Sequence, residues 1–210
     1  SSGHLILFSK FTTFPDQGLE MDIAVHVGSV LAVMIYFSEE IAKMFKGLVK
    51  NYFLPNFKDY GNRIFYLICI ATIPAVIFGF LFHKYGADLV RNTKLIGWTI
   101  TGFAFLLFFA DRIGMTIRKA EHLTITDAII IGLAQCVALI PGTSRSGITI
   151  TAGRFLGLER REAAKFSMLL AIPTIIGAGA LVAFELFEAG DLSSVLYAID
   201  AVTYSFIASI

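Results

Sequence analysis

The chain has 210 residues, of which 56% are apolar and only 16% are charged. This balance lies well outside the range of soluble domains and indicates an integral membrane protein. The formal net charge is +1, and the basic residues are spread over connecting segments without a continuous patch, so the composition excludes a nucleic-acid-binding surface. We expect an all-α polytopic membrane protein, because a lipid-facing backbone has to satisfy its own hydrogen bonds.

Long apolar segments predict the helices that cross the membrane. Most of them approach the roughly 20 residues that a spanning helix requires. The predicted crossings are 20–38, 63–82, 95–110, 166–186 and 195–210.

The connections between these crossings sort onto two faces that differ in charge. The connections 39–63, 111–124 and 154–165 share one face and carry five, three and four Lys or Arg residues, which makes 12. The connections on the other face, 10–19, 83–94 and 187–194, carry four. Cytoplasmic loops of membrane proteins hold the excess of positive charge, so the first face is predicted to be cytoplasmic. Arg145 is then the only basic residue left inside the membrane.

The most informative segment is Pro141-Gly142-Thr143-Ser144-Arg145-Ser146-Gly147. Gly142 and Gly147 let the backbone leave helical geometry, and three hydroxyls in the segment can donate hydrogen bonds. The amides of such a turn can converge on an anion while the guanidinium of Arg145 binds two of its oxygens. The segment therefore predicts a phosphate site. The alternative is a Gly/Ser loop between two helices whose arginine extends to water.

A short internal match suggests that the fold arose by duplication. Residues 2–11 align with residues 146–155, with four identities and one Lys-for-Arg pair. The segments 4–11 and 148–155 are too short to cross the membrane, so each is interpreted as the second limb of a re-entrant hairpin. We expect inverted-topology repeats over 1–110 and 111–210, with two re-entrant helical hairpins that meet near the membrane midplane.

This topology brings residues from the two halves into one predicted site. The site combines Ser1, Ser2 and His4 with the Ser144-Arg145-Ser146 segment. His26 lies on an apolar helix and could face the same cavity. The favoured interpretation is a structural role, with Asp22 one turn away as its hydrogen-bond partner.

At these residues the sequence resembles the bacterial undecaprenyl-pyrophosphate phosphatases of the bacitracin-resistance type. The resemblance rests on Ser1-Ser2-Gly3-His4, on Gly28-Ser29 and above all on the 141–147 segment. It implies hydrolysis of undecaprenyl pyrophosphate to the monophosphate, which recycles the lipid carrier of peptidoglycan synthesis and confers bacitracin resistance. It also implies a site that opens to the outer side of the bacterial inner membrane.

The resemblance assigns roles to individual residues. His4 and Ser1 match the catalytic histidine and serine of the family, and Arg145 matches its phosphate-binding arginine. Ser144 and Ser146 match the flanking serines that contact phosphate. The sequence does not choose between Ser1 and a water molecule as the nucleophile. The family also implies a divalent cation, Mg or Ca, and a homodimer is among the assemblies that the sequence leaves open.

The chain departs from the family pattern at its ends. The pair of glutamates that precedes the Ser/Gly/His motif in the family would lie upstream of Ser1, so no metal ligand is assigned here. We expect the chain to be a fragment that lacks both termini. Two other functions fit parts of the sequence. One is a secondary transporter or lipid flippase, which also uses inverted repeats with broken helices. The other is a membrane scaffold, but this function would not explain the arginine in the membrane.

Overall fold

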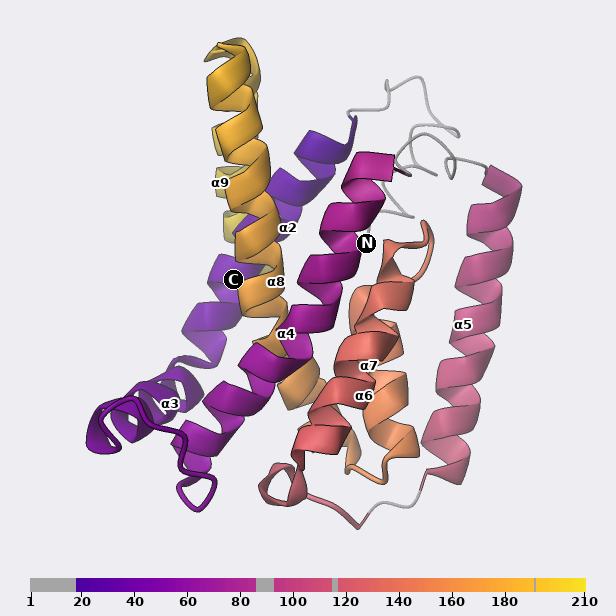
Figure 1. The fold of residues 1–210 in the computed structure, drawn as a ribbon. Helices are drawn as coiled ribbons and strands as arrows, with labels where there is room; N and C mark the ends of the chain where they lie inside the picture. The colour runs from indigo at the N-terminus through magenta and orange to yellow at the C-terminus, as the bar shows by residue number, and fades with distance from the viewer. Residues whose placement is uncertain (1–17, 86–92, 115–116, 191) are drawn as a thin grey trace.

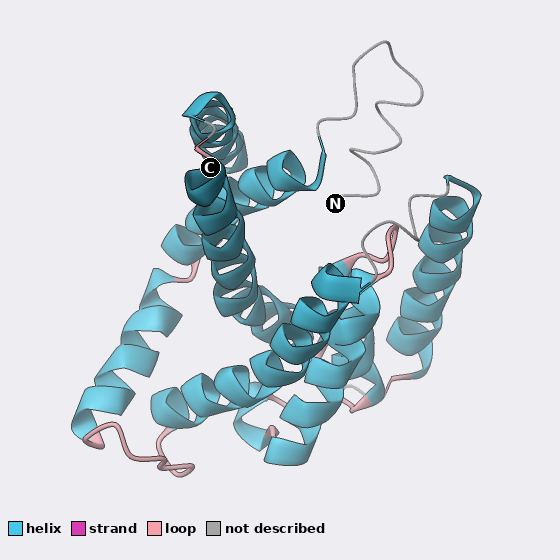
Figure 2. Ribbon diagram, turned by 45° about the horizontal axis from the view of Figure 1, so that its top comes forward, coloured by secondary structure: helices cyan, strands magenta, loops and turns pink. Residues whose placement is uncertain are grey.

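The computed structural model describes residues 18–85, 93–114, 117–190 and 192–210. The α-helices in these ranges are α2 (Gly18–Tyr36), α3 (Ser38–Lys50), α4 (Tyr60–Tyr85), α5 (Thr93–Ile113), α6 (Ile125–Cys136), α7 (Arg145–Phe155), α8 (Arg160–Ala189) and α9 (Leu192–Ser209). Figure 2 shows helices joined by short turns. The described residues contain no strand, only an isolated backbone bridge between Arg118 and Leu158. The prediction of an all-α chain is confirmed.

Three of the described helices, α4, α5 and α8, are long and apolar enough to cross a membrane. The bent pair formed by α2 and α3 adds a fourth crossing if it counts as one broken span. The predicted crossings 63–82, 95–110 and 166–186 fall within α4, α5 and α8, which confirms a multi-pass membrane protein.

The connection predicted at 39–63 contains a helix that the hydropathy pattern did not indicate. α3 leaves α2 at an angle of 76°. Its sequence places Ile41, Met44 and Leu48 on one face and interleaves them with Glu and Lys residues. Apolar residues three and four positions apart with charges between them are typical of an amphipathic helix that lies along a surface.

The ends of the helices gather at two opposite ends of the molecule. Figure 1 shows the α3–α4, α5–α6 and α7–α8 connections at the bottom, and the end of α4, the start of α5, the end of α8 and the start of α9 at the top. α6 rises from the bottom, and α7 returns to it, so this antiparallel pair begins and ends on one side (Figure 1). These are the connections that the sequence analysis assigned to two faces.

The hydrophobic core lies where α4, α6 and α8 meet. Leu67, Ile131 and Leu170, one from each helix, are almost completely buried there. α4 and α6 approach so closely at Gly132 that a Cβ atom on this residue would lie 2.4 Å from the carbonyl oxygen of Ala71. Glycine is therefore required at this crossing, and it fixes the position of the α6–α7 pair against α4.

α2 is held by α9 through a second close contact. A Cβ atom on Gly28 would lie 2.2 Å from the carbonyl oxygen of Val202. The hydroxyl oxygens of Ser29 and Ser205 are 3.0 Å apart, and the Ser205 hydroxyl donates to the carbonyl of Val25. Small residues at an interface let two helices pack backbone to backbone in a membrane. This contact fixes the face of α2 that carries His26 and Ser29.

The bottom end of α6 is stabilised by a capping box and an ion pair. The Thr124 hydroxyl accepts a hydrogen bond from the Asp127 N–H, and the Asp127 carboxylate accepts one from the Thr124 N–H. Arg118 Nη2 lies 2.6 Å from Asp127 Oδ2. Asp127 is buried, and this pairing satisfies the charge that the sequence places in an apolar segment.

Arg154, which the sequence analysis placed in the 154–165 connection, is more deeply buried in the protein than Arg145. Arg154 ends α7 and is only 2% exposed, whereas Arg145 is half-buried. Arg154 Nη1 donates to the carbonyl of Leu158, and Nη2 lies 3.2 Å from the carbonyls of Asp111 and Gly114. Asp111 and Gly114 are distant in the sequence, so the sequence alone did not indicate that Arg154 is buried.

Candidate functional site

The 141–147 segment forms a tight turn followed by the start of α7. Gly142 has φ +88°, a left-handed conformation that L side chains rarely adopt. A Cβ atom on Gly142 would also lie 2.3 Å from the Thr99 hydroxyl oxygen. That hydroxyl donates to the carbonyl oxygen of Pro141, 2.8 Å away. The hydrogen bond therefore holds the turn against α5, and the close contact requires glycine at position 142.

Ser144 caps the helix that begins at Arg145. Its backbone is extended, and its hydroxyl accepts a hydrogen bond from the Gly147 N–H at 3.2 Å. The first N–H groups of an α-helix have no partner within the helix, and the helix dipole adds partial positive charge there. The start of α7 combines this positive end with the Arg145 guanidinium, which is the arrangement that binds phosphate in many proteins.

A cavity of about 310 Å³ lies in front of this helix start. Four consecutive residues of the predicted phosphate segment line it, namely Thr143, Ser144, Arg145 and Ser146. Val25, His26 and Ser29 of α2 and Ala138 complete the described wall. Gly142 and Gly147 shape the turn and its cap and are absent from this lining. The structure thus places four of the six predicted residues of the 142–147 segment around one cavity.

Thr143 contributes a buried hydroxyl, unpartnered among the described residues, to the segment that lines the cavity. Thr143 is 6% exposed, and within the described part of the chain its Oγ1 has no hydrogen-bond partner. A buried polar atom without a partner costs free energy, on the order of 1–3 kcal/mol.

Two buried hydroxyls support the Arg145-Ser146 turn from behind. Thr149 Oγ1 lies 3.0 Å from the Arg145 carbonyl oxygen and 3.1 Å from that of Ser146. It also lies 2.6 Å from Ser167 Oγ of α8. Both side chains are at most 3% exposed. α8 therefore holds the first turn of α7 in place without reaching the cavity.

His26 is a site residue for which the sequence analysis favoured a structural role. Its Nδ1 lies 2.5 Å from the main-chain carbonyl oxygen of Asp22, so Nδ1 carries the proton when the ring is neutral. Asp22 is the predicted partner, but it contributes its backbone rather than its carboxylate. His26 also lines the cavity opposite Arg145. Its spacing of three residues from Ser29 put both on one helical face, which was the available signal.

Ser1, Ser2 and His4 lie outside the described residues. The predictions that these residues meet the Arg145 turn, and that residues 2–11 repeat the structure of residues 146–155, are therefore untested and stay predictions.

The described side chains do not by themselves form a magnesium or calcium site. These cations prefer several carboxylate or carbonyl oxygens. Among the residues that the structure describes, no three His, Cys, Asp or Glu side chains come together to hold a metal ion. The described wall of the cavity offers one imidazole and several hydroxyls instead.

Comparison with known proteins gives the family. The family model described as bacitracin resistance protein BacA matches residues 1–210. An undecaprenyl-diphosphatase of Roseobacter denitrificans is 47% identical over 194 residues, which cover 91% of this chain and 72% of that protein. One of Alteromonas mediterranea is 46% identical over 191 residues, with 91% and 71% covered. Undecaprenyl-diphosphatase 1 of Rhodospirillum rubrum is 41% identical over 216 residues, with 100% and 76% covered. The chain belongs to the BacA family of bacitracin resistance proteins.

Proposed function

We propose that this protein hydrolyses undecaprenyl pyrophosphate to undecaprenyl phosphate and inorganic phosphate. The relatives carry the name of this activity, and the site has the chemistry that it needs. The observation that carries the proposal is the cavity that is lined by Arg145, at the start of α7, and by its hydroxyl-bearing neighbours Thr143, Ser144 and Ser146. The activity returns the lipid carrier to cell-wall synthesis, and it underlies bacitracin resistance.

The reaction requires neutralised phosphate charge, a nucleophile and proton transfer. Arg145 and the N-terminal end of α7 would stabilise the charge that builds on the terminal phosphoryl oxygens. The hydroxyls of Thr143, Ser144 and Ser146 would orient that group. Because Nδ1 of His26 donates to a carbonyl, its Nε2 is left to accept a proton or, when protonated, to donate one to phosphate.

The nucleophile attacks the terminal phosphorus, and the bond from that phosphorus to the bridging oxygen breaks. Undecaprenyl phosphate leaves with the bridging oxygen. A water molecule would yield inorganic phosphate directly, with His4 as the base. Attack by Ser1 would form a phosphoserine, which water then hydrolyses to the same product. Both routes consume one water molecule for each phosphate released.

We also propose that the α6–α7 pair is a re-entrant hairpin in the bacterial inner membrane. α6 has 12 residues and α7 has 11, so each is roughly 16–18 Å long, against about 30 Å of hydrocarbon. Both outer ends lie on the face that carries the excess of Lys and Arg, and this supports entry from the cytoplasm. The Arg145 turn would then lie near the midplane, in a cavity that opens outward. Residues 1–110 and 111–210 would be the two inverted repeats.

The resemblance further supports a requirement for a divalent cation, magnesium or calcium. Chelation with EDTA should stop phosphate release, and either cation should restore it. Release that is indifferent to EDTA would remove the cation from the proposal.

The function is tested by measuring phosphate release from undecaprenyl pyrophosphate by the purified protein in detergent, followed by lipid translocation in proteoliposomes. Release of one phosphate per lipid supports the proposal. A folded protein that moves the lipid across the bilayer without releasing phosphate would instead be the transporter or flippase.

A further inference from the structure

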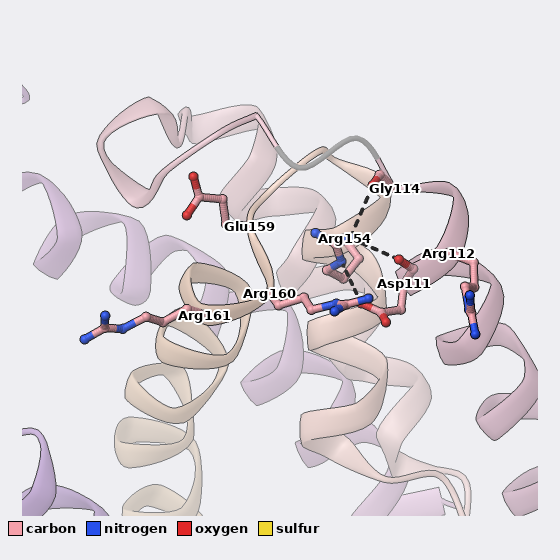
Figure 3. Close-up of a pocket in the computed structure, with 7 residues that line it drawn as sticks. All are labelled: Asp111, Arg112, Gly114, Arg154, Glu159, Arg160 and Arg161. Carbon is pink, nitrogen blue, oxygen red and sulfur yellow. Dashed lines mark hydrogen bonds and ion pairs between the residues drawn. The ribbon is translucent and has the colours of Figure 1, made fainter.

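A second cavity, larger than the first, lies at the opposite end of α7. Its volume is about 580 Å³, and the ends of α5 and α7 and the start of α8 form its wall. Figure 3 shows the side chains that line it. Arg154 in this wall follows Arg145 by nine residues, which is roughly 14 Å along the helix. The two cavities are therefore separate, and this one lies on the face with the excess of basic residues.

The centre of this cavity is a fixed ion-pair cluster. Asp111 Oδ1 lies 2.6 Å from Arg160 Nε and 3.3 Å from Arg154 Nε. Arg154 is fully buried and is held by three main-chain carbonyls, so it cannot swing away. Arg160 contacts Asp111 through Nε, which leaves the Nη groups of its planar fork directed elsewhere. The cluster thus rests on the buried Arg154 and presents the exposed guanidinium of Arg160 to the cavity.

The lining carries more positive than negative charge. Four arginines face two carboxylates, those of Asp111 and Glu159, so two positive charges are left over. Within the described ranges, Arg112 and Arg161 form no ion pair. Figure 3 shows them on opposite sides of the central cluster. Both side chains extend away from the cluster, so they would attract an anion over it through their charge and not by direct contact. The guanidinium of Arg160 suits phosphate, because its planar fork matches two oxygens.

Exposed apolar side chains adjoin the cationic lining. The Arg112 guanidinium lies over the ring of Phe108, 5.3 Å from its centroid, and Phe108 is 53% exposed. Ile113 and Phe155, the chain neighbours of Arg112 and Arg154, are 70% and 54% exposed. A free anion would make no favourable contact with these apolar side chains, whereas the acyl chains of a lipid would pack against them. Basic pockets between membrane helices on the cytoplasmic side are suited to lipid headgroups.

We propose that this cavity binds the phosphate group of an anionic phospholipid from the cytoplasmic leaflet. The ligand chemistry is a phosphate diester with attached acyl chains, seated over Arg160 between Arg112 and Arg161. The proposal is independent of the catalytic site, because its test measures lipid binding and not hydrolysis.

The test compares lipid binding to purified protein in detergent by native mass spectrometry, with phosphatidylglycerol and phosphatidylcholine of equal chain length. The wild-type protein should prefer phosphatidylglycerol. Replacement of Arg112 and Arg161 together by Gln should weaken that preference by on the order of tenfold, since each surface arginine contributes a few-fold. The double replacement by Lys should keep it. Lys46→Gln, which removes an exposed charge from α3 outside the cavity, is the matched control and should also keep it.

Three results would overturn the proposal. The first is an unchanged preference in the Arg112→Gln, Arg161→Gln protein, and the second is an equal loss in Lys46→Gln, which would indicate general surface electrostatics. The third is displacement of phosphatidylglycerol by an equal concentration of inorganic phosphate, which would show that the acyl chains contribute nothing. Should the double variant fail to fold, the wild-type preference is measured against ionic strength. A preference that salt does not reduce would contradict binding by arginines.

Discussion

The buried hydroxyl pair behind the Arg145 turn allows a test of how the site is held. Ser167 Oγ and Thr149 Oγ1 are 2.6 Å apart, and Thr149 Oγ1 also contacts the carbonyls of Arg145 and Ser146. Thr149→Val removes all three contacts and leaves the Ser167 hydroxyl buried. We expect it to destabilise the fold by about 2–3 kcal/mol, and Ser167→Ala by about 1 kcal/mol, because Thr149 then keeps its contacts with the two carbonyls.

The two substitutions should not be additive. If the hydroxyls act as a pair, the double variant is more stable than the sum of the single effects indicates, by about 0.5–1.5 kcal/mol. Neither side chain reaches the cavity, so the loss of activity should come through the position of the turn and lower kcat more than it raises KM. Thermal unfolding and phosphate-release kinetics measure these quantities.

The matched control for this cycle is Thr174→Val on the same helix. Thr174 Oγ1 donates to the carbonyl of Leu170 within α8 and accepts a hydrogen bond from Gln135 Nε2 of α6 at 3.4 Å, away from the turn. It should lose a similar hydrogen bond and keep its kcat. Additive single effects, or an equal loss of kcat in Thr174→Val, would refute the claim that the pair positions the site.

Two further predictions concern the frame around the site. Gly132→Ala should destabilise the protein by about 1–3 kcal/mol, because the new methyl group meets the Ala71 backbone. Gly97→Ala in α5 is the control and should be neutral or stabilising, because nothing lies within 4 Å of the new methyl group. Equal effects of the two substitutions on thermal unfolding would contradict the α4–α6 crossing. Burial by itself raises the pKa of Asp127, but the hydrogen bonds from Arg118 and Thr124 outweigh it and hold the pKa below its usual value. The ion pair therefore contributes stability that is fully present above about pH 4 and is lost as the pH falls further. The Asp127→Asn protein should be less stable than the wild type at neutral pH, and its free energy of unfolding should depend less on pH in acid. An unchanged dependence of that free energy on pH would argue against the pairing.

The sequence predicted those parts of the structure that depend on local pattern. α4, α5 and α8 follow from runs of apolar residues, since hydrocarbon thickness sets their length. The turn before α7 follows from Gly142, because glycine lets the backbone leave helical geometry. These features need no knowledge of what packs against them.

What the sequence did not predict depends on contacts between distant segments. The burial of Arg154 was not predicted, since the Asp111 and Gly114 carbonyls that hold it are 43 and 40 residues away. α3 was overlooked because its apolar residues alternate with charges and never form a run. For His26 a structural role was favoured over a place in the cavity, because the position of α2, set by α9, decides between the two. In each case tertiary packing decides the outcome.

The most direct test of the catalytic site is phosphate release from undecaprenyl pyrophosphate by Arg145→Ala, with Lys46→Ala as the control for loss of a surface charge. If Arg145 and the start of α7 stabilise the reacting phosphate, Arg145→Ala should lower kcat by at least about 100-fold, while its elution profile and thermal stability stay close to those of the wild type. A folded Arg145→Ala protein that releases phosphate at nearly the wild-type rate would show that hydrolysis takes place elsewhere in the molecule.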